Sequence, residues 1–376
     1  MSNPNGMNGQ WIGKWEGSSR GPIMVNIDER ELHYAGAAYL LDENPALPGT
    51  AAFFSTPNKD NPQQFRADLL AIDRDSGDFF SWDKVKSKFP ADVTFPKSAE
   101  VTGTWNIDSL KFSWVTDIGT QGTCELPRSK ADKPSEIVSQ KLSWSDYKTH
   151  VSNLLSKGHL FRGQNGSWRL RTSFHRSGRA DLHRYLTEDV PALHRQLSAR
   201  TKHVFNLKDP DENGAFYNLV QHHGYPTPLL DWTYSPYVAA FFAYREISNE
   251  KAASAPKDET VRVLVFDQSL WRTDLNQILL LIRSFPYVSV GEFIAIENER
   301  MIPQQAASTI TNVDDIETYI RSYETATKKY LWAIDLPVRE RRDVVRELSY
   351  MGITAGSLFP GLDGACEELK ERNFEI

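Results

Sequence analysis

Residues 221–233 read QHHGYPTPLLDWT, and this stretch decides how the second half of the chain is interpreted. Gly224, Pro226 and Pro228 predict a defined turn, because glycine reaches backbone angles closed to other residues and proline fixes its own φ. From the turn to Thr233, polar side chains alternate with apolar ones, which indicates an extended segment. We therefore expect polar groups of this stretch to contribute to a site.

Helical and extended patterns surround this turn on both sides. Residues 215–223 and the amphipathic PYVAAFFAYRE (236–246) predict helices, as do LSWSDYKTHVSNLLSK (142–157), which has a serine cap signal, and residues 339–350. HLFRGQ (159–164) and VRVLVFD (261–267) predict strands. This mixture predicts an α+β domain over residues 141–376.

The first 126 residues have a different pattern and predict an all-β domain, either a small barrel or a sandwich. Short alternating segments are separated by turn clusters such as NPALPG and PNKDNPQ. Five tryptophans fall in or beside these segments, where core positions are the usual explanation. Residues 127–140 are polar, contain two prolines, and are interpreted as a linker.

Length and composition limit the class of protein. A chain of 376 residues exceeds one small domain, and 40% hydrophobic with 24% charged residues is an ordinary globular mixture. The longest apolar runs fall far short of the roughly 20 residues of a membrane span, and the first ten residues lack a signal-peptide pattern. Cys124 and Cys366 are the only cysteines, which favours a reducing compartment. We predict a cytoplasmic protein without a membrane partner.

The net charge of −6 excludes a generally basic nucleic-acid binder, but the charge is uneven. Between residues 162 and 208 ten Arg and Lys face three acidic residues, a local balance of +7. Such a stretch can hold phosphates, and a solvated helix face is the alternative interpretation.

Several site classes lack their motifs. Neither a Rossmann fingerprint, a P-loop, Cys-x-x-Cys nor His-Glu-x-x-His is present, and no carboxylate cluster suggests a metal-dependent nuclease. His222 and His223 are adjacent on a predicted helix and point about 100° apart, so no metal site is predicted. The sequence GSSRG (17–21) matches the hydrolase pattern Gly-x-Ser-x-Gly, but a strand follows it where a nucleophile elbow needs a helix.

Two further segments are polar where a plain core has no need of polarity. Phe161-Arg162-Gly163-Gln164 ends an apolar strand with an arginine, which is costly to bury unless it binds an anion. Residues 297–305, ENERMIPQQ, contain Glu297 and Glu299. These segments and the 221–233 stretch are the candidates for chemistry.

Together with AAFFA (239–243) and GITAGSLFPGLDG (352–364), these residues resemble the FRG domain, which is named for its Phe-Arg-Gly motif and occurs in bacterial and phage proteins. The resemblance covers residues 142–366. Two positions depart from the family pattern: His223 stands where the family tends to have tyrosine, and Pro228 where it tends to have arginine. If that arginine holds a phosphate in the family, this chain must use another residue.

The motif order is also similar to that of the ADP-ribosyltransferases. In that fold an arginine ends the first strand and anchors NAD, a Ser-Thr-Ser-type strand precedes a helix rich in alanine and phenylalanine, and a Glu-x-Glu precedes an apolar pair and a proline. Arg162, the Asp231-Trp232-Thr233 segment and Glu297-x-Glu299 take the corresponding places. The resemblance implies an ADP-ribosyltransferase-like FRG domain at residues 141–376.

The resemblance also implies roles. Arg162 would bind the pyrophosphate of NAD, Glu299 would be the catalytic carboxylate, His222 would orient the ribose or act as base, and Gln304 would contact the acceptor. The sequence does not decide between Glu297 and Glu299. The predicted NAD-binding residues are Arg162, Gly163, Gln164, Thr227, Asp231, Trp232 and Thr233, with Trp232 or a tyrosine as a wall for nicotinamide.

Plainer interpretations of the same residues stay open. Arg162 can be a structural partner of Asp231, and Trp232 can belong to the core. Asp231 can be a helix cap or a turn residue before the helix that begins at Pro236. His222 can be a satisfied histidine at a helix end, and both glutamates can be solvated.

The leading hypothesis is an NAD-dependent ADP-ribosyltransferase of a bacterial or phage toxin or anti-phage defence system, with NAD as co-substrate and no metal. The basic stretch favours RNA or single-stranded DNA over protein as acceptor. The β domain would select the target or bind an antitoxin. The alternatives are a nucleotide- or nucleic-acid-binding module without turnover, and an NAD glycohydrolase.

Overall fold

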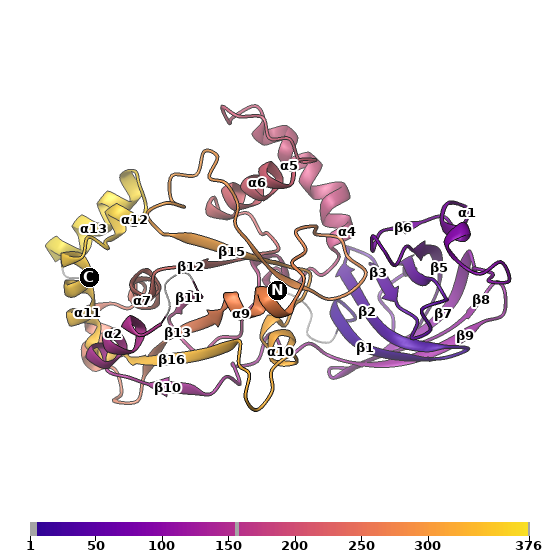
Figure 1. Cartoon of the computed structure of the whole chain (residues 1–376), viewed down its shortest axis with the longest axis horizontal. Coiled ribbons are helices and arrows are strands. Elements are labelled where there is room, and N and C mark those ends of the chain that lie inside the picture. Colours follow the sequence, from indigo (N-terminus) through magenta and orange to yellow (C-terminus); the bar gives the residue numbers. More distant parts are fainter. Residues whose placement is uncertain (1–5, 155–157, 375–376) are drawn as a thin grey trace.

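The computed structural model describes residues 6–154 and 158–374 of the chain. An antiparallel β-barrel near the N-terminus and a larger α/β domain lie side by side (Figure 1). The all-β prediction for the first domain is confirmed, and the barrel is the form that it takes. The last residues of the predicted 142–157 helix, 155–157, lie outside the described residues.

The barrel is a simple meander in which each strand pairs with its neighbours along the chain. Within the described residues, eight strands close it through the β4–β5 and β1–β9 pairings, and β6 (Phe79–Phe80) pairs with β5 outside the closure. The strands are β1 (Gly9–Gly17), β2 (Arg20–Glu29), β3 (Tyr34–Leu40), β4 (Gly49–Ser55), β5 (Gln63–Ile72), β7 (Ser98–Trp105), β8 (Ser109–Thr116) and β9 (Gln121–Pro127). Alternate side chains point inward, so that Ile23, Val25 and Ile27 of β2 lie in the barrel core.

The second domain is built on one mixed sheet in the order β10-β16-β13-β11-β12-β15-β14. Its strands are β10 (Ser139–Lys141), β11 (His159–Gln164), β12 (Leu229–Thr233), β13 (Thr260–Asp267), β14 (Val288–Gly291), β15 (Ala306–Thr311) and β16 (Leu331–Pro337). β11 and β12 share only the pair Phe161↔Thr233, whereas the pairings on either side are longer. The sheet is therefore weakly joined at its centre.

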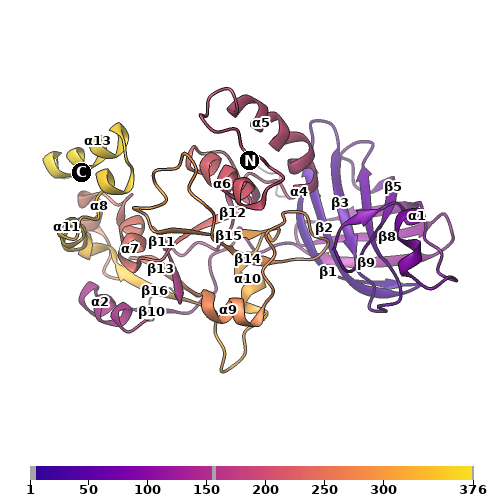
Figure 2. The same ribbon diagram turned by 45° about the horizontal axis from the view of Figure 1, so that its top comes forward.

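Helices cover both faces of this sheet (Figures 1 and 2). One face packs against α2 (Trp144–Ser152), α7 (Pro236–Tyr244), α8 (Asn249–Ser254), α11 (Arg341–Tyr350) and α12 (Ala355–Leu358). The other packs against α9 (Gln268–Asp274) and α10 (Ile316–Arg321). A separate core joins β12 and β15 to α3 (Ser173–Arg176), α4 (Leu182–Arg184), α5 (Val190–Leu197) and α6 (Pro210–His222), and α13 (Leu362–Phe374) ends the described chain.

Local signals explain these boundaries. The strand predicted at residues 159–164 is β11, and the Ser143 hydroxyl caps α2 by accepting the Asp146 N–H. The alternating residues that follow the proline turn form β12, a regular strand. The helix predicted at 236–246 is α7, and its N-cap is Ser235, whose hydroxyl accepts the Val238 N–H. The interpretation of Asp231 as the cap of this helix is therefore wrong.

The two domains are joined through a buried carboxylate at the end of β2. Asp28 is 1% exposed and its Oδ2 lies 2.8 Å from Nε of Arg179 and 3.1 Å from Nη1 of Arg184. Its Oδ1 accepts the backbone N–H groups of Ala180 and Asp181. A buried charge with this many partners ties the barrel to the α3–α4 region, and both views show α4 beside the barrel.

The segment 127–140, interpreted as a linker, is held against the second domain. Ala131 and Ile137 are buried, and Glu136 lies 3.0 Å from Arg169. β10 at its end pairs in parallel with β16. Its polar residues pair with residues far away in sequence. Because the sequence does not show these partners, the polar composition was interpreted as a linker.

Candidate functional site

A cleft of ≈ 600 Å³ lies where β11 and β12 separate. Its walls come from β11, β12, the segment after β11, the end of α6, and α7. Most of the residues singled out from the sequence line this cleft: Arg162, Gly163, Gln164, His222, Asp231, Trp232, Thr233 and Gln304. Thr227 and Glu299 are not among its lining residues.

Arg162 bridges the separating strands. Its Nη1 donates to the backbone oxygen of Asp231 at 2.5 Å, a carbonyl that the short β11–β12 pairing leaves free. The Nε–H of Arg162 is buried and has no hydrogen-bond partner within residues 6–154 and 158–374. Burial lowers the pKa of this guanidinium to about 10, an effect that nearby Asp231 opposes and nearby Arg176 reinforces. A desolvated cation with a free donor is suited to bind an anion.

Two neighbours share this unsatisfied character. The Oε1 of Gln164 is buried and accepts no hydrogen bond from the described residues. Arg176 also lines the cleft, and desolvation lowers its pKa, with Asp231 opposing the shift. Neither Arg162 nor Arg176 forms an ion pair with a carboxylate in the part of the chain described. Arg162 and Arg176 are therefore arginines of the cleft without a carboxylate partner among the described residues. The lining also includes Lys133, Arg169 and Arg171 and the carboxylates of Asp132, Asp231 and Glu246.

Gly163 has a packing role. A Cβ at this position would lie 1.8 Å from the backbone oxygen of Ala239 and 2.6 Å from the backbone nitrogen of Ala243. The small residues of α7 and Gly163 together allow helix and strand to approach closely. This contact fixes β11, and with it Arg162, against α7.

A chain of side chains behind β12 holds Asp231. The Thr227 hydroxyl donates to Oε1 of Gln221, whose Nε2 donates to Oδ1 of Asp231. Thr227 is fully buried, so it positions Gln221 and does not face the cleft. Thr233 is also occupied, since its hydroxyl donates to the backbone oxygen of Gln304 at 2.7 Å.

His222 connects the cleft to the loop that precedes β15. Its Nδ1 lies 2.7 Å from Oδ1 of Asn298, and its backbone oxygen accepts from Arg300. Asn298, between the two predicted glutamates, is 6% exposed and thus points inward. Glu297 accepts the backbone N–H of His203, and Glu299 is exposed. Asn298 and Arg300 hold this loop against His222, while neither glutamate is among the lining residues of the cleft.

Gln304 lies at the other end of this loop and is buried. Its Nε2 donates to the backbone oxygen of Leu358 at 2.9 Å. The loop is strained at both ends, because Glu297 has φ 52° and Gln305 has φ 46°. Left-handed backbone at residues other than glycine costs about 1–3 kcal/mol and often marks segments that rearrange.

The aromatic wall of the cleft includes a tryptophan, Trp168, that the sequence analysis did not single out. The Trp232 ring is 3% exposed, packs 5.5 Å from Phe266 and donates to Thr309, so it belongs to the core. Trp168 and Phe242 also line the cleft, and Trp168 is 63% exposed. In the sequence, Trp168 follows Gln164 by four residues, and this closeness to the Phe-Arg-Gly motif was the signal that could have identified it as a cleft residue.

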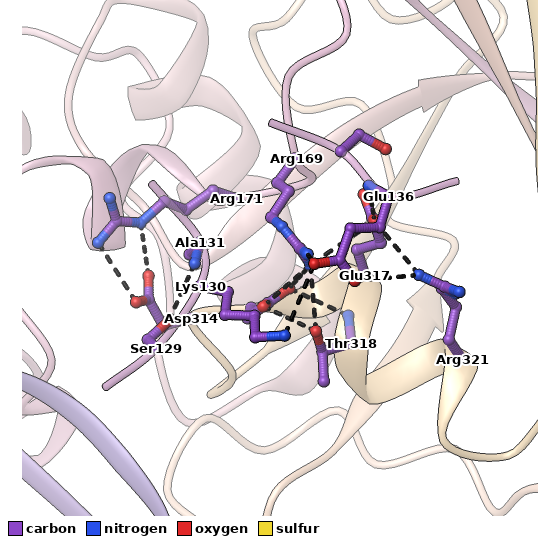
Figure 3. A network of polar contacts seen from close by, with 12 residues as sticks. Ser129, Lys130, Ala131, Glu136, Arg169, Arg171, Asp314, Glu317, Thr318 and Arg321 are labelled. Carbon is purple, nitrogen blue, oxygen red and sulfur yellow. Dashed lines mark hydrogen bonds and ion pairs between the residues drawn. The ribbon is translucent and has the colours of Figure 1, made fainter. Parts of the chain in front are cut away.

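Four of the ten basic residues between 162 and 208 pair with carboxylates. Arg169 lies among Glu136, Asp315 and Glu317, and Arg171 pairs with Asp314 at 2.5 Å (Figure 3). Arg179 and Arg184 pair with Asp28, Asp189 and Glu188. These carboxylates mostly come from outside the stretch, so the local balance of +7 overstates its free charge. The exposed basic residues that remain are Arg176, Arg195, Arg200, Lys202 and Lys208.

A comparison with known protein families identifies the domain that carries the Phe161-Arg162-Gly163 motif of this cleft. The model of the FRG domain family matches residues 157–252. The chain contains an FRG domain. The matched part of the FRG domain includes β11, α6, β12 and α7, the elements that supply most of the cleft. No curated protein and no solved structure matches the chain.

Two other features are absent from the described residues. No group of three or more His, Cys, Asp or Glu side chains in 6–154 and 158–374 is arranged to hold a metal ion. Nor does any helix in these ranges combine the length and the apolar character that crossing a bilayer requires.

Proposed function

We propose that the FRG domain of this chain binds NAD in the cleft and transfers ADP-ribose from it to an acceptor. The observation that carries the proposal is the buried Nε–H of Arg162, which lacks a partner among the described residues beside the free Oε1 of Gln164. Unpaired buried polar groups are costly, and they are usual where a ligand completes the hydrogen bonds. The split between β11 and β12 supplies the space.

The residue types suit a dinucleotide. Arg162 would bind the pyrophosphate, and Arg176 would take the place of the family arginine that Pro228 replaces. Trp168 and Phe242 offer a surface on which a flat ring can stack. The Oε1 of Gln164 can accept from a ribose hydroxyl or an amide N–H.

In the transfer, a nucleophile of the acceptor forms a bond to C1′ of the ribose, and nicotinamide leaves with the electrons of the broken glycosidic bond. The proton of the nucleophile passes to His222, which releases it to solvent. Glu299 would stabilise the positive charge that develops on the ribose. This role requires the strained loop between Glu297 and Gln305 to rearrange when NAD binds, because Glu299 is otherwise exposed.

We favour RNA or single-stranded DNA as the acceptor. The exposed cations in and after α5, at 195, 200, 202 and 208, support a phosphate-rich partner. A nucleic-acid-modifying transferase fits a bacterial or phage toxin or a defence effector that acts in the cytoplasm. The barrel would then select the target or bind an antitoxin.

Labelled NAD tests the proposal. The purified chain is incubated with NAD labelled in the adenylate half and with RNA, single- and double-stranded DNA and cell lysate. Label should appear on one nucleic acid, and Glu299→Gln should abolish it, whereas the matched control Glu297→Gln should retain it. Label on a protein of the lysate would transfer the proposal to a protein acceptor.

A second candidate is a nucleotide-binding module without turnover, favoured by the position of Glu299 outside the cleft lining. It predicts NAD binding that Glu299→Gln leaves unchanged, with neither labelling nor nicotinamide release. Release of nicotinamide and free ADP-ribose without any macromolecule would instead identify an NAD glycohydrolase.

A further inference from the structure

The barrel contains a cavity of ≈ 240 Å³ that is separate from the cleft. It is bounded by the β1–β2 turn, the β3–β4 loop, the β8–β9 turn and residues 93–96. These lie at the end of the barrel where Glu16 faces Arg20, whereas Asp28 and Gln10, which contact the second domain, lie toward the other end. The mouth of the cavity therefore faces away from the FRG domain.

The distribution of side-chain sizes explains why this end is hollow. An eight-stranded barrel is just wide enough either for its own side chains to fill it or for one small ligand. At the closed end, Trp11, Trp105 and Tyr34 fill the interior, and Trp11 donates to the backbone oxygen of Met7. Toward the mouth, four adjacent strands place alanines on the inner wall: Ala38, Ala52, Ala67 and Ala99.

The lining defines the chemistry of an occupant. The deep wall is formed by alanines together with Phe54, Phe65 and Phe112, which give water no polar partners. Trp15 and Trp114, whose ring centroids are 5.9 Å apart and whose planes are tilted by 52°, form an aromatic wall nearer the mouth. A cavity of about 150 Å³ with an apolar lining can hold benzene, so this one has room for a two-ring molecule.

The polar groups stand at the mouth. Ser19 and Thr50 contribute hydroxyls that can bond one polar end of a ligand. Among the described residues that line the cavity, Asp42 alone carries a charge, and it accepts the backbone N–H of Asn44. The absence of a lining cation disfavours carboxylates and phosphates, and the apolar depth disfavours any charged ligand.

We propose that the barrel binds an uncharged, mainly apolar small molecule of about two fused rings, with one hydrogen-bonding group directed to the mouth. The barrel is then a ligand-binding domain in the same chain as the FRG domain. This site does not depend on NAD binding in the cleft.

Calorimetric titration of the full chain with 1-naphthol tests the proposal, with 1-naphthoate and 1-naphthylmethylammonium as charged counterparts. The neutral probe should bind, and the charged probes should bind at least about tenfold more weakly. Ala52→Leu and Ala67→Leu fill the cavity and should each weaken 1-naphthol binding about tenfold or more. Thr104→Leu adds the same side chain on an exposed position of β7 and should leave binding unchanged.

Thermal unfolding of each variant verifies that it is folded. Because the two filling variants lie on different strands, one remains informative if the other does not fold. The proposal is overturned if 1-naphthol does not bind. It is also overturned if both folded filling variants bind it as the unaltered chain does, since the probe would then occupy another place.

Discussion

Replacing Gly163 by alanine tests how the Phe-Arg-Gly motif works. The new Cβ would lie 1.8 Å from the backbone oxygen of Ala239, where ordinary contact begins near 3.4 Å, so α7 or β11 must move by about 1.6 Å. Because the three nearest atoms that it meets in α7 all belong to the backbone, no side-chain rotation relieves the contact. Overpacking of this kind costs about 1–3 kcal/mol. For a domain of this size the melting temperature should fall by about 2–4 °C for each kcal/mol.

Differential scanning calorimetry of Gly163→Ala measures this effect. Gln164→Ala is the matched control on the same strand, because it only shortens a side chain that lines the cleft. We expect the transition of the FRG domain to fall by several degrees in Gly163→Ala and to stay in place in Gln164→Ala. A Gly163→Ala protein as stable as the unaltered chain would refute the packing role. Contact with a bound ligand would then be the remaining role for this glycine.

Three further predictions concern the cleft wall and the contact between domains. Trp168→Ala should weaken NAD binding by about 1–3 kcal/mol in a titration and leave the melting temperature unchanged, because the ring is exposed. Burial, with a contribution from Asp28, raises the pKa of Asp181 to about 7, so the folded chain keeps a proton that the unfolded chain loses near pH 4. The free energy of unfolding therefore falls as pH rises from about 4 to 7. Relative to the unaltered chain, Asp181→Asn should gain up to about 4 kcal/mol of unfolding free energy across that window, measured by urea unfolding. A difference that stays constant with pH would contradict this. Asp28→Ala leaves Arg179 and Arg184 without their buried partner and should lower the free energy of unfolding by about 3–5 kcal/mol. In calorimetry the two domains should then melt separately. A single transition at the melting temperature of the unaltered chain would speak against a stabilising role for this contact.

Strong local signals made much of the fold predictable. β11 follows from an apolar strand, and the serine cap of α2 fixes its start. The helix α7 was predicted, but its amphipathic character was not confirmed, because every residue from Pro236 to Tyr244 is buried or half-buried. β12 was expected only as an extended turn, because the two prolines before it dominate the pattern. A barrel differs from a sandwich here by the β4–β5 and β1–β9 pairings, which close the sheet. These pairings join segments that are distant in sequence or separated by a loop, so the local sequence pattern does not show them.

The candidate site was predictable where one segment carries several polar residues. Arg162 and Asp231 meet in the cleft because their strands are neighbours in the sheet. The charge of the basic stretch was not predictable, since Arg169 pairs with Asp315 and Glu317 about 150 positions away. The same limit applies to the loop before β15, where the contact of Asn298 with His222 turns the glutamates outward.

Binding of NAD to the cleft is the central claim, and isothermal titration calorimetry tests it most directly. Titration of NAD into the full chain and into Arg162→Met, with melting temperature as a check on folding, gives the result in one experiment. We predict binding to the unaltered chain and a loss of about tenfold or more in the folded variant, because the guanidinium would be the pyrophosphate contact. Equal affinity in both proteins, or no heat of binding in either, would contradict the claim.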